Sequence, residues 1–236
     1  MAGIEAGATL LKVGVAVIQR IAPSGIALFK SWLKGKEIMI VGQARSGKTT
    51  FVDYLQYGLF EDEKDTDRTI DAVRSARFNV KMGRDATLEL TVRSVIDVPG
   101  HAGPVEHAKL VFERRPHALI IFTDLTRPLK GDSERASAVW IREFCLALEA
   151  RWRANRKRKN RITTIILVMN KSDKAEEKKI ASWKQAFRRI VDAELREARG
   201  QMLEEIAIIP CALVTNPEGT KAVDSLIAHL AKALAR

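Results

Sequence analysis

The segment GQARSGKT at positions 42–49 restricts the fold more than any other part of the sequence. It fits the pattern G-x-x-x-x-G-K-[ST], in which glycines let consecutive backbone N–H groups wrap closely around a phosphate. Directly before it, the apolar run at 38–41 is short and β-branched enough to be a buried parallel strand. Directly after it, apolar residues recur at helical spacing over 50–55. A strand, a glycine-bounded loop and a helix are the context in which this pattern binds phosphate.

The residue types in this loop indicate its chemistry. We expect Lys48 to reach the β- and γ-phosphates of a nucleotide and the Thr49 hydroxyl to ligate Mg²⁺. The positive end of the following helix would point at the phosphates as well. The expected nucleotide-binding set in this segment is completed by Gly42, Ala44, Arg45, Ser46, Gly47 and Thr50. The loop alone leaves the nucleotide open, because ATPases, kinases and GTPases share it.

The composition limits the class of protein and its partners. At 236 residues, the chain can hold one α/β domain with an ordinary core plus an extension. A formal net charge of +11 is high for an ordinary enzyme, and suggests contact with nucleic acid, acidic lipid head groups or an acidic partner. Cys145 and Cys211 lie in apolar stretches, which favours reduced core thiols in a cytoplasmic protein.

The first 35 residues differ from the rest of the chain. Over 4–21, Glu5, Lys12 and Gln19 recur every seven positions, on one narrow face of an otherwise apolar helix. In the stretch 26–36, lysines alternate with aromatic and aliphatic residues, as in helices at a membrane surface. The uninterrupted apolar runs are shorter than the roughly 20 residues of a transmembrane helix. A peripheral membrane anchor, a partner-binding helix and an arm packed on its own domain all remain open.

The rest of the chain alternates between expected strands and helices. The charged stretch 60–71 is expected to be an exposed loop, and 73–82 with 87–97 to form an antiparallel hairpin. Buried strands are expected at 118–124, 162–168 and 206–209, and helices at 105–114, 133–153, 176–199 and 219–235. This alternation predicts an α/β fold whose mostly parallel sheet binds ligands at the carboxyl ends of its strands.

The segment NKSD at 170–173 follows one of these strands and carries chemistry for recognising a base. The Asp173 carboxylate can accept hydrogen bonds from both the N1–H and the exocyclic amine of guanine, which adenine does not offer together. A site built for those bonds rejects other bases, because its own polar groups would be left unpaired. The segment DVPGH at 97–101 also follows an expected strand.

In order and spacing, these segments resemble the G domain of the Ras-like and translation-factor GTPase superfamily, over residues 36–236. The match rests on G-x-x-x-x-G-K-[ST], D-x-x-G at 97–100 and N-K-x-D at 170–173. The resemblance implies a three-layer P-loop NTPase G domain, with one antiparallel edge strand in a mostly parallel sheet. Residues 1–35 would form a helical extension before it.

The resemblance also implies roles for residues near the γ-phosphate. Asp97 would hold Mg²⁺, usually through water, and the Gly100 N–H would meet the γ-phosphate. His101 would orient the attacking water, where Ras-like proteins usually carry glutamine and translation factors carry histidine. Thr69 would close over Mg²⁺ and the γ-phosphate, with Thr66 as the alternative. Together with Lys48, His101 and Thr69 form the implied catalytic set.

For the base, the resemblance implies that Asn170 ties its loop to the phosphate loop and that the Lys171 stem lies over guanine. The segment at 211–213, made of Cys211, Ala212 and Leu213, resembles S-A-K or S-A-L, in which the Ala212 N–H would meet guanine O6. Cys211 departs from the usual serine.

The loop itself departs from the pattern of many small GTPases, which have two glycines where this chain has Ala44 and Arg45. The added methyl group could slow hydrolysis or block an arginine supplied by a partner. Arg45 either approaches the phosphates or faces solvent. We therefore expect GTP binding with a low rate of turnover.

The implied function is a stand-alone small GTPase, a switch that binds GTP and GDP with Mg²⁺ and hydrolyses GTP slowly. Order–disorder changes of 60–72 and 97–110 would drive the switch and its recognition by a protein effector or regulator. One alternative is a non-hydrolysing GTP-binding module of a larger assembly. The other is an RNA- or ribosome-associated GTPase, suggested by His101 and by the basic run 151–161, which could equally be a solvated loop.

Overall fold

The computed structural model describes most of the region after residue 36. The described residues are 37–57, 78–82, 86–90, 94–97, 102–131, 136–155, 157, 161–195 and 205–214, with 222, 223, 226, 229 and 230. For 53–57, 78–82, 86–90, 94–97 and residue 205, only the backbone is described. The predicted extension at 1–35 and the predicted loop at 60–71 lie outside the described residues.

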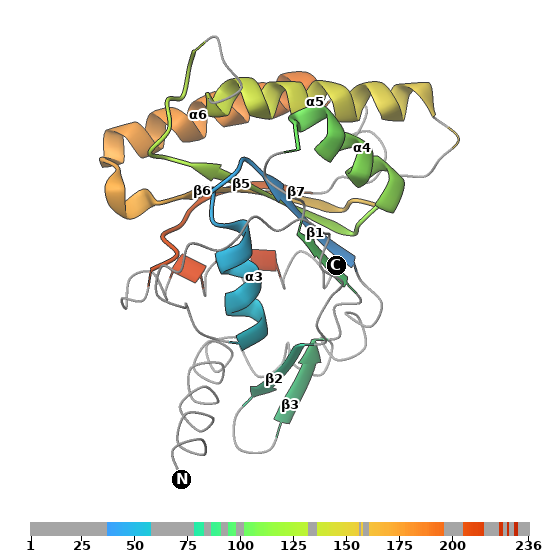
Figure 1. Cartoon of the computed structure of the whole chain (residues 1–236), viewed down its shortest axis with the longest axis vertical. Coiled ribbons are helices and arrows are strands. Elements are labelled where there is room, and N and C mark those ends of the chain that lie inside the picture. The colour runs from blue at the N-terminus through green and yellow to red at the C-terminus, as the bar shows by residue number, and fades with distance from the viewer. Residues whose placement is uncertain are drawn as a thin grey trace.

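Five described strands form a parallel sheet in the order β4-β1-β5-β6-β7 (Figure 1). In this order they are β4 (Ser94–Asp97), β1 (Glu37–Gly42), β5 (Ala118–Asp124), β6 (Thr164–Asn170) and β7 (Glu205–Pro210). β5 and β6 pair over their whole length, so that Asp124 lies beside Asn170 at the carboxyl end. Because all five strands point the same way, their carboxyl ends meet at one edge, where open α/β sheets bind ligands.

The central strands are continuous apolar runs because helices cover both faces of the sheet. β5 and β6 are buried at every residue, and β1 at every residue after Glu37. Alternate side chains point to opposite faces. Figure 1 shows α4 (Pro104–Arg114), α5 (Ser137–Ala154) and α6 (Glu177–Glu194) above the sheet, and α3 (Lys48–Tyr57) below it. This is the predicted three-layer α/β arrangement.

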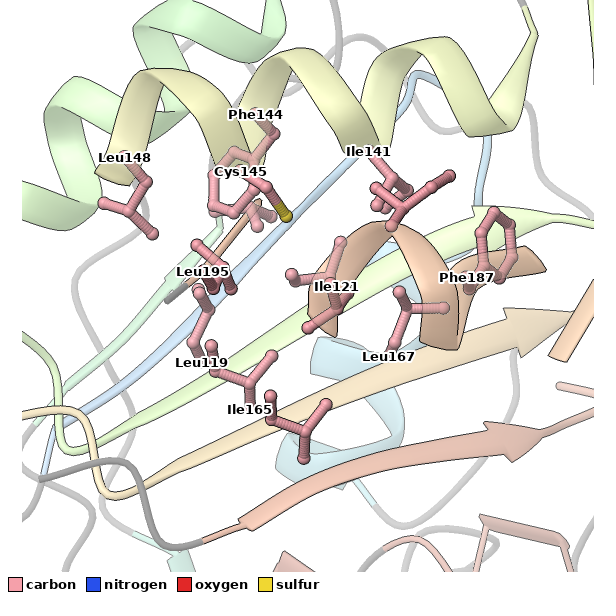
Figure 2. Packing of buried hydrophobic residues seen from close by; sticks show 14 of the residues in the cluster. Leu119, Ile121, Ile141, Phe144, Cys145, Leu148, Ile165, Leu167, Phe187 and Leu195 are labelled. Atoms are coloured by element: carbon pink, nitrogen blue, oxygen red, sulfur yellow. The ribbon is translucent and has the colours of Figure 1, made fainter. Parts of the chain in front are cut away.

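The large core cluster lies between the sheet and the helices α4, α5 and α6, and Figure 2 shows part of it. Phe144 and Leu148 of α5 project from the helix toward Leu119 and Ile121 of β5, and all four side chains are fully buried. Burying large apolar side chains in this way is the main force that joins helix to sheet. On the other face, Phe51 of α3 contacts Phe122 of β5, with ring centroids 5.4 Å apart.

Both cysteines are free and buried, as the sequence predicted. Burial raises the pKa of the Cys145 thiol, and the nearby carboxylates of Glu194 and Glu149 raise it further. Burial raises the pKa of Cys211 to about 12. Both side chains are therefore neutral thiols that pack as small apolar groups.

The structure confirms the antiparallel pairing of the predicted hairpin, whereas the predicted antiparallel edge strand of the main sheet is not shown. β2 (Phe78–Met82) and β3 (Ala86–Leu90) pair in antiparallel fashion, but they form a separate two-stranded sheet. The predicted second strand, 87–97, contains both β3 and β4, and β4 pairs in parallel with β1. Among the described strands, β4 and β7 lie at the two edges of the five-stranded sheet and both pair in parallel with their neighbours. Alternation identifies a strand, but it does not identify the strand's partner.

The predicted helices are present where the structure describes them. α4 and α5 lie within a few residues of the predicted ranges, and α6 spans most of 176–199. In the predicted last helix, the described residues are helical, and Val223, Leu226 and Leu230 are buried. No helix in the described part of the chain is both long and apolar enough to cross a membrane.

A matched pair of leucines on α5 tests the packing against the sheet. We expect Leu148→Ala to lower the free energy of unfolding by about 2–5 kcal/mol, because it opens a cavity in a fully buried part of the core. Leu146 is 47% exposed, so Leu146→Ala should change this energy by less than about 1 kcal/mol. Urea unfolding of both variants measures the difference, and equal losses would contradict the described orientation of α5.

Candidate functional site

The phosphate loop connects the end of β1 at Gly42 to the start of α3 at Lys48. Its two glycines both have positive φ, +144° at Gly42 and +95° at Gly47. A Cβ atom at Gly42 would lie 2.2 Å from the carbonyl oxygen of Phe122, and one at Gly47 would lie 2.2 Å from Nδ2 of Asn170. Glycine is therefore required at both positions, for the backbone conformation and for the close approach of neighbouring segments.

The cation of Lys48 lies against the start of this loop. Its Nζ donates hydrogen bonds to the carbonyl oxygens of Gly42 (3.1 Å) and Gln43 (2.8 Å), and the residue is 5% exposed. α3 begins at the same residue, so the N-terminus of a ten-residue helix and an ammonium group converge on the loop. This combination of donors suits a phosphate chain, whose negative charge both groups attract.

Side chains from four other parts of the chain hold the loop in place. They come from α4, from the turn after β5, from the start of α5 and from the end of β6. The contacts are Gly42 N–H to His107 Nδ1 (3.4 Å), Ser137 Oγ to Gln43 Oε1 (3.0 Å), Arg127 Nη2 to the Ala44 carbonyl (2.6 Å) and Asn170 Nδ2 to the Ser46 carbonyl (2.9 Å). Only Asn170 was predicted to make such a contact. The other three side chains lie in no recognisable motif, although Arg127 follows a predicted strand at its carboxyl end.

Asn170 joins three segments of the site. Its Nδ2 donates to the Ser46 carbonyl, and its Oδ1 accepts a hydrogen bond from the Leu213 N–H at 3.2 Å. The side chain is almost fully buried, which makes both bonds costly to lose. The predicted link between the N-K-x-D segment and the phosphate loop is therefore present, and the same residue also holds the segment 211–213.

The segment 211–213 lies beside N-K-x-D through its backbone. The Ser172 N–H donates to the carbonyl of Cys211 (3.0 Å), and the Cys211 N–H donates to the carbonyl of Met169 (2.9 Å). Cys211 and Ala212 are buried. The thiol that replaces the usual serine is thus accommodated in the interior, while backbone bonds position the segment.

Lys171 has a left-handed backbone conformation, with φ of +62° and ψ of +36°. Its Nζ forms an ion pair with Oδ2 of Asp124 at 2.6 Å, and Asp124 is almost fully buried. Thr126 donates to Oδ1 of the same carboxylate through its N–H (2.9 Å) and its hydroxyl (2.7 Å). Sequence reasoning missed Asp124, although this residue ends a predicted strand next to Asn170. The ion pair holds the Lys171 ammonium at the turn after β5.

The structure describes the remaining predicted site residues to different extents. Thr49 and Thr50 lie in the first turn of α3, and Arg45 is exposed. Asp173 lies in the short 3-10 helix Ser172–Lys174 and is also exposed. Asp97 ends β4 opposite Ile40, and only its backbone is described. The residues outside the described part of the chain are Thr66, Thr69, Gly100 and His101.

The basic run at 151–161 is described only at 151–155, 157 and 161. α5 extends to Ala154 and therefore includes the start of the run. Trp152 is 4% exposed and belongs to the core cluster, so it does not lie among the basic side chains as a surface aromatic. Arg153 pairs with Glu149 at 3.2 Å.

The Asp124 carboxylate should make stability depend on acidity. Burial alone would raise the pKa of Asp124, but hydrogen bonds from Lys171 and Thr126 outweigh it and hold the pKa below the ordinary value of 3.8. A carboxyl whose pKa is lower in the folded protein stabilises it above the unfolded pKa, and this contribution is lost as the pH falls through the folded pKa. We expect Asp124→Asn to lower the free energy of unfolding by about 1–3 kcal/mol at pH 7, and by less at pH 3.

Chemical unfolding at both pH values, compared with wild type, measures this difference. Glu106→Gln is the control, because its partner Lys109 lies 3.4 Å away on an exposed surface, where an ion pair contributes little. An Asp124→Asn deficit of the same size at pH 7 and pH 3 would contradict a charged carboxylate in the folded protein.

Comparisons with known proteins support the fold but identify no family for this chain. No family model matches the chain, and no curated protein matches it. A bacterial selenocysteine-specific elongation factor, EF-Sec, superposes with a TM-score of 0.50 at 17% identity, over 84% of this chain and 29% of that one. The structure of the mammalian SRP receptor superposes with a TM-score of 0.50 at 20% identity, over 84% of this chain and 100% of that one.

The elongation factor SelB from Methanococcus maripaludis gives a TM-score of 0.49 at 19% identity, over 84% of this chain and 35% of that one. The chain thus spans about a third of the length of the two elongation factors. At these identities the comparisons show the fold alone. The chain has the fold of a P-loop GTPase G domain.

Proposed function

We propose that this chain is a guanine-nucleotide-binding switch that binds GTP and GDP with Mg²⁺ and hydrolyses GTP slowly. The observation that carries the proposal is the placement of Asn170. Its one buried side chain joins the phosphate loop to the two segments with guanine-binding patterns, N-K-x-D and 211–213. A site for phosphate and a site for guanine are thereby held next to each other, at the carboxyl edge of the sheet.

The phosphate end of the proposed site has a suitable set of donors. Lys48 and the N-terminus of α3 supply positive charge, and the two glycines keep the loop free of side chains at its close contacts. The Thr49 hydroxyl, at the start of α3, would ligate Mg²⁺ together with Asp97 and Thr69. Bound Mg²⁺ would neutralise charge on the β- and γ-phosphates.

The base end depends on Asp173 and on backbone groups of 211–213. The Asp173 carboxylate would accept two hydrogen bonds from guanine, and the Ala212 N–H would donate to O6. The ion pair between Lys171 and Asp124 supports this assignment, because it holds the left-handed residue that leads into the 3-10 helix carrying Asp173. The proposed base-selecting carboxylate thus lies on the short helix that follows this ion-paired residue.

Turnover would depend on residues around the γ-phosphate. His101 would orient the attacking water, and Thr69 would close over the phosphate. Ala44 places a methyl group where many small GTPases have glycine, which favours slow hydrolysis. Attachment of residues 1–35 to a membrane or a partner, and binding of an effector, stay predictions from the sequence.

Replacing the base-selecting carboxylate tests the proposed ligand. Asp173→Asn removes an acceptor and adds a donor, so GDP affinity should fall by about a hundredfold or more. Because an amide can donate to the O2 atom of xanthine, the variant should gain affinity for xanthosine diphosphate. Displacement of a fluorescent nucleotide measures both affinities.

Glu176→Gln is the matched control, since it removes an exposed carboxylate three positions further along and should leave GDP affinity unchanged. Equal binding of ADP and GDP by the wild-type protein would overturn the assignment of guanine.

Single-turnover hydrolysis separates the switch from a non-hydrolysing GTP-binding module. Wild type should convert bound GTP to GDP slowly. His101→Ala should lower the rate by about a hundredfold, because the attacking water loses its orienting group. His101→Gln should retain most of the rate, because an amide can also orient water. A wild-type protein that holds GTP unchanged would instead support the non-hydrolysing alternative.

A further inference from the structure

Arg45 has an unusual backbone conformation in the middle of the phosphate loop. Its φ is +59°, in the left-handed region that residues with a side chain rarely adopt. Glycine reaches this region without a steric penalty, whereas arginine does not. The loop therefore needs support at this position that a glycine-containing loop would not need.

Arg127 is placed to supply that support. Its Nη2 donates to the carbonyl oxygen of Ala44 at 2.6 Å, so a charged group contacts the peptide directly before Arg45. Hydrogen bonds from a guanidinium group are shorter and stronger than those between neutral groups. The contact joins residues 83 positions apart, so it forms only when the loop and the turn after β5 are both folded.

The turn that carries Arg127 is itself held firmly. The Arg127 N–H donates to the Asp124 carbonyl at 3.1 Å, and Thr126 donates twice to the Asp124 carboxylate. The Leu125 N–H donates to the Asn170 carbonyl at 3.0 Å. Arg127 therefore extends from a well-anchored turn, and its guanidinium can hold the loop in place.

Holding the Ala44 carbonyl also sets the direction of the next N–H group. The peptide bond between Ala44 and Arg45 is trans, so its C=O and N–H point in opposite directions. With the carbonyl turned toward Arg127, the Arg45 N–H points away from Arg127. A loop that wraps a phosphate binds it with successive backbone N–H groups that line a concave surface.

We propose that Arg127 is a positioning residue for phosphate binding, which holds the peptide between Ala44 and Arg45 so that the Arg45 N–H is directed at a phosphate of the nucleotide. This inference rests on the proposed function. It also explains how the loop tolerates arginine where many small GTPases have glycine. Arg127 acts through the loop and not by contact with the nucleotide.

A double-mutant cycle with Arg45→Gly tests this role. Arg127→Ala should raise the Kd for GDP about tenfold, the loss expected for one charge-assisted hydrogen bond, and Arg127→Lys should give a smaller loss. In the Arg45→Gly background, the same Arg127→Ala change should raise the Kd for GDP about threefold or less, because glycine adopts the loop conformation unaided. Lys130→Ala, which removes an exposed cation from the same connection, is the control and should have no effect.

Amide hydrogen exchange of nucleotide-free protein gives a second readout. Residues 43–48 should exchange faster in Arg127→Ala than in wild type, and the difference should shrink in the Arg45→Gly background. An equal increase in the Kd for GDP on Arg127→Ala in both backgrounds, or unchanged hydrogen exchange in this segment, would overturn the proposal. If wild type does not bind GDP, the proposed function fails, and the exchange experiment still decides whether Arg127 holds the loop.

Discussion

The two hydrogen bonds of the Asn170 side chain connect parts of the chain that nothing in the local sequence brings together. Ser46 is 124 positions away and Leu213 is 43 positions away, yet both contact the same buried amide. The contact also explains a glycine, because a Cβ atom at Gly47 would lie 2.2 Å from Nδ2 of Asn170. The phosphate loop, the N-K-x-D segment at 170–173 and the 211–213 segment thus depend on one side chain, and removing it would leave backbone groups without partners.

Cationic side chains at the proposed site form bonds to other groups of the protein. Lys48 binds loop carbonyls, Arg127 binds another loop carbonyl, and Lys171 binds the carboxylate of Asp124. Each bond directs a backbone segment, because it fixes the orientation of a peptide or of a turn. The turn at 124–127 is central to this arrangement, since it contacts the phosphate loop through Arg127 and the N-K-x-D segment through Asp124. This one turn therefore contacts both ends of the proposed nucleotide site.

Much of the architecture could be predicted because it follows from local patterns. The strand 118–124 has the predicted bounds, and α4 begins one residue before the predicted helix. The link from Asn170 to the phosphate loop was also predicted, through the N-K-x-D resemblance. Arg127, Ser137 and His107 could not be found in this way, since each acts on a loop atom far away in the sequence. The pairing of β4 with β1 could not be found from the sequence for a similar reason, because the partner of a strand depends on the whole topology.

The sequence alone specified the phosphate loop, its flanking strand and helix, and the order of the motifs, since glycine positions and apolar periodicity act over a few residues. Tertiary structure determined which side chains hold that loop. Arg45 illustrates the division. Its presence in place of glycine is visible in the sequence, whereas its left-handed backbone and the guanidinium of Arg127 on the preceding carbonyl appear only in the fold. Such contacts form between distant segments, and only packing of the sheet and helices brings them within hydrogen-bonding distance.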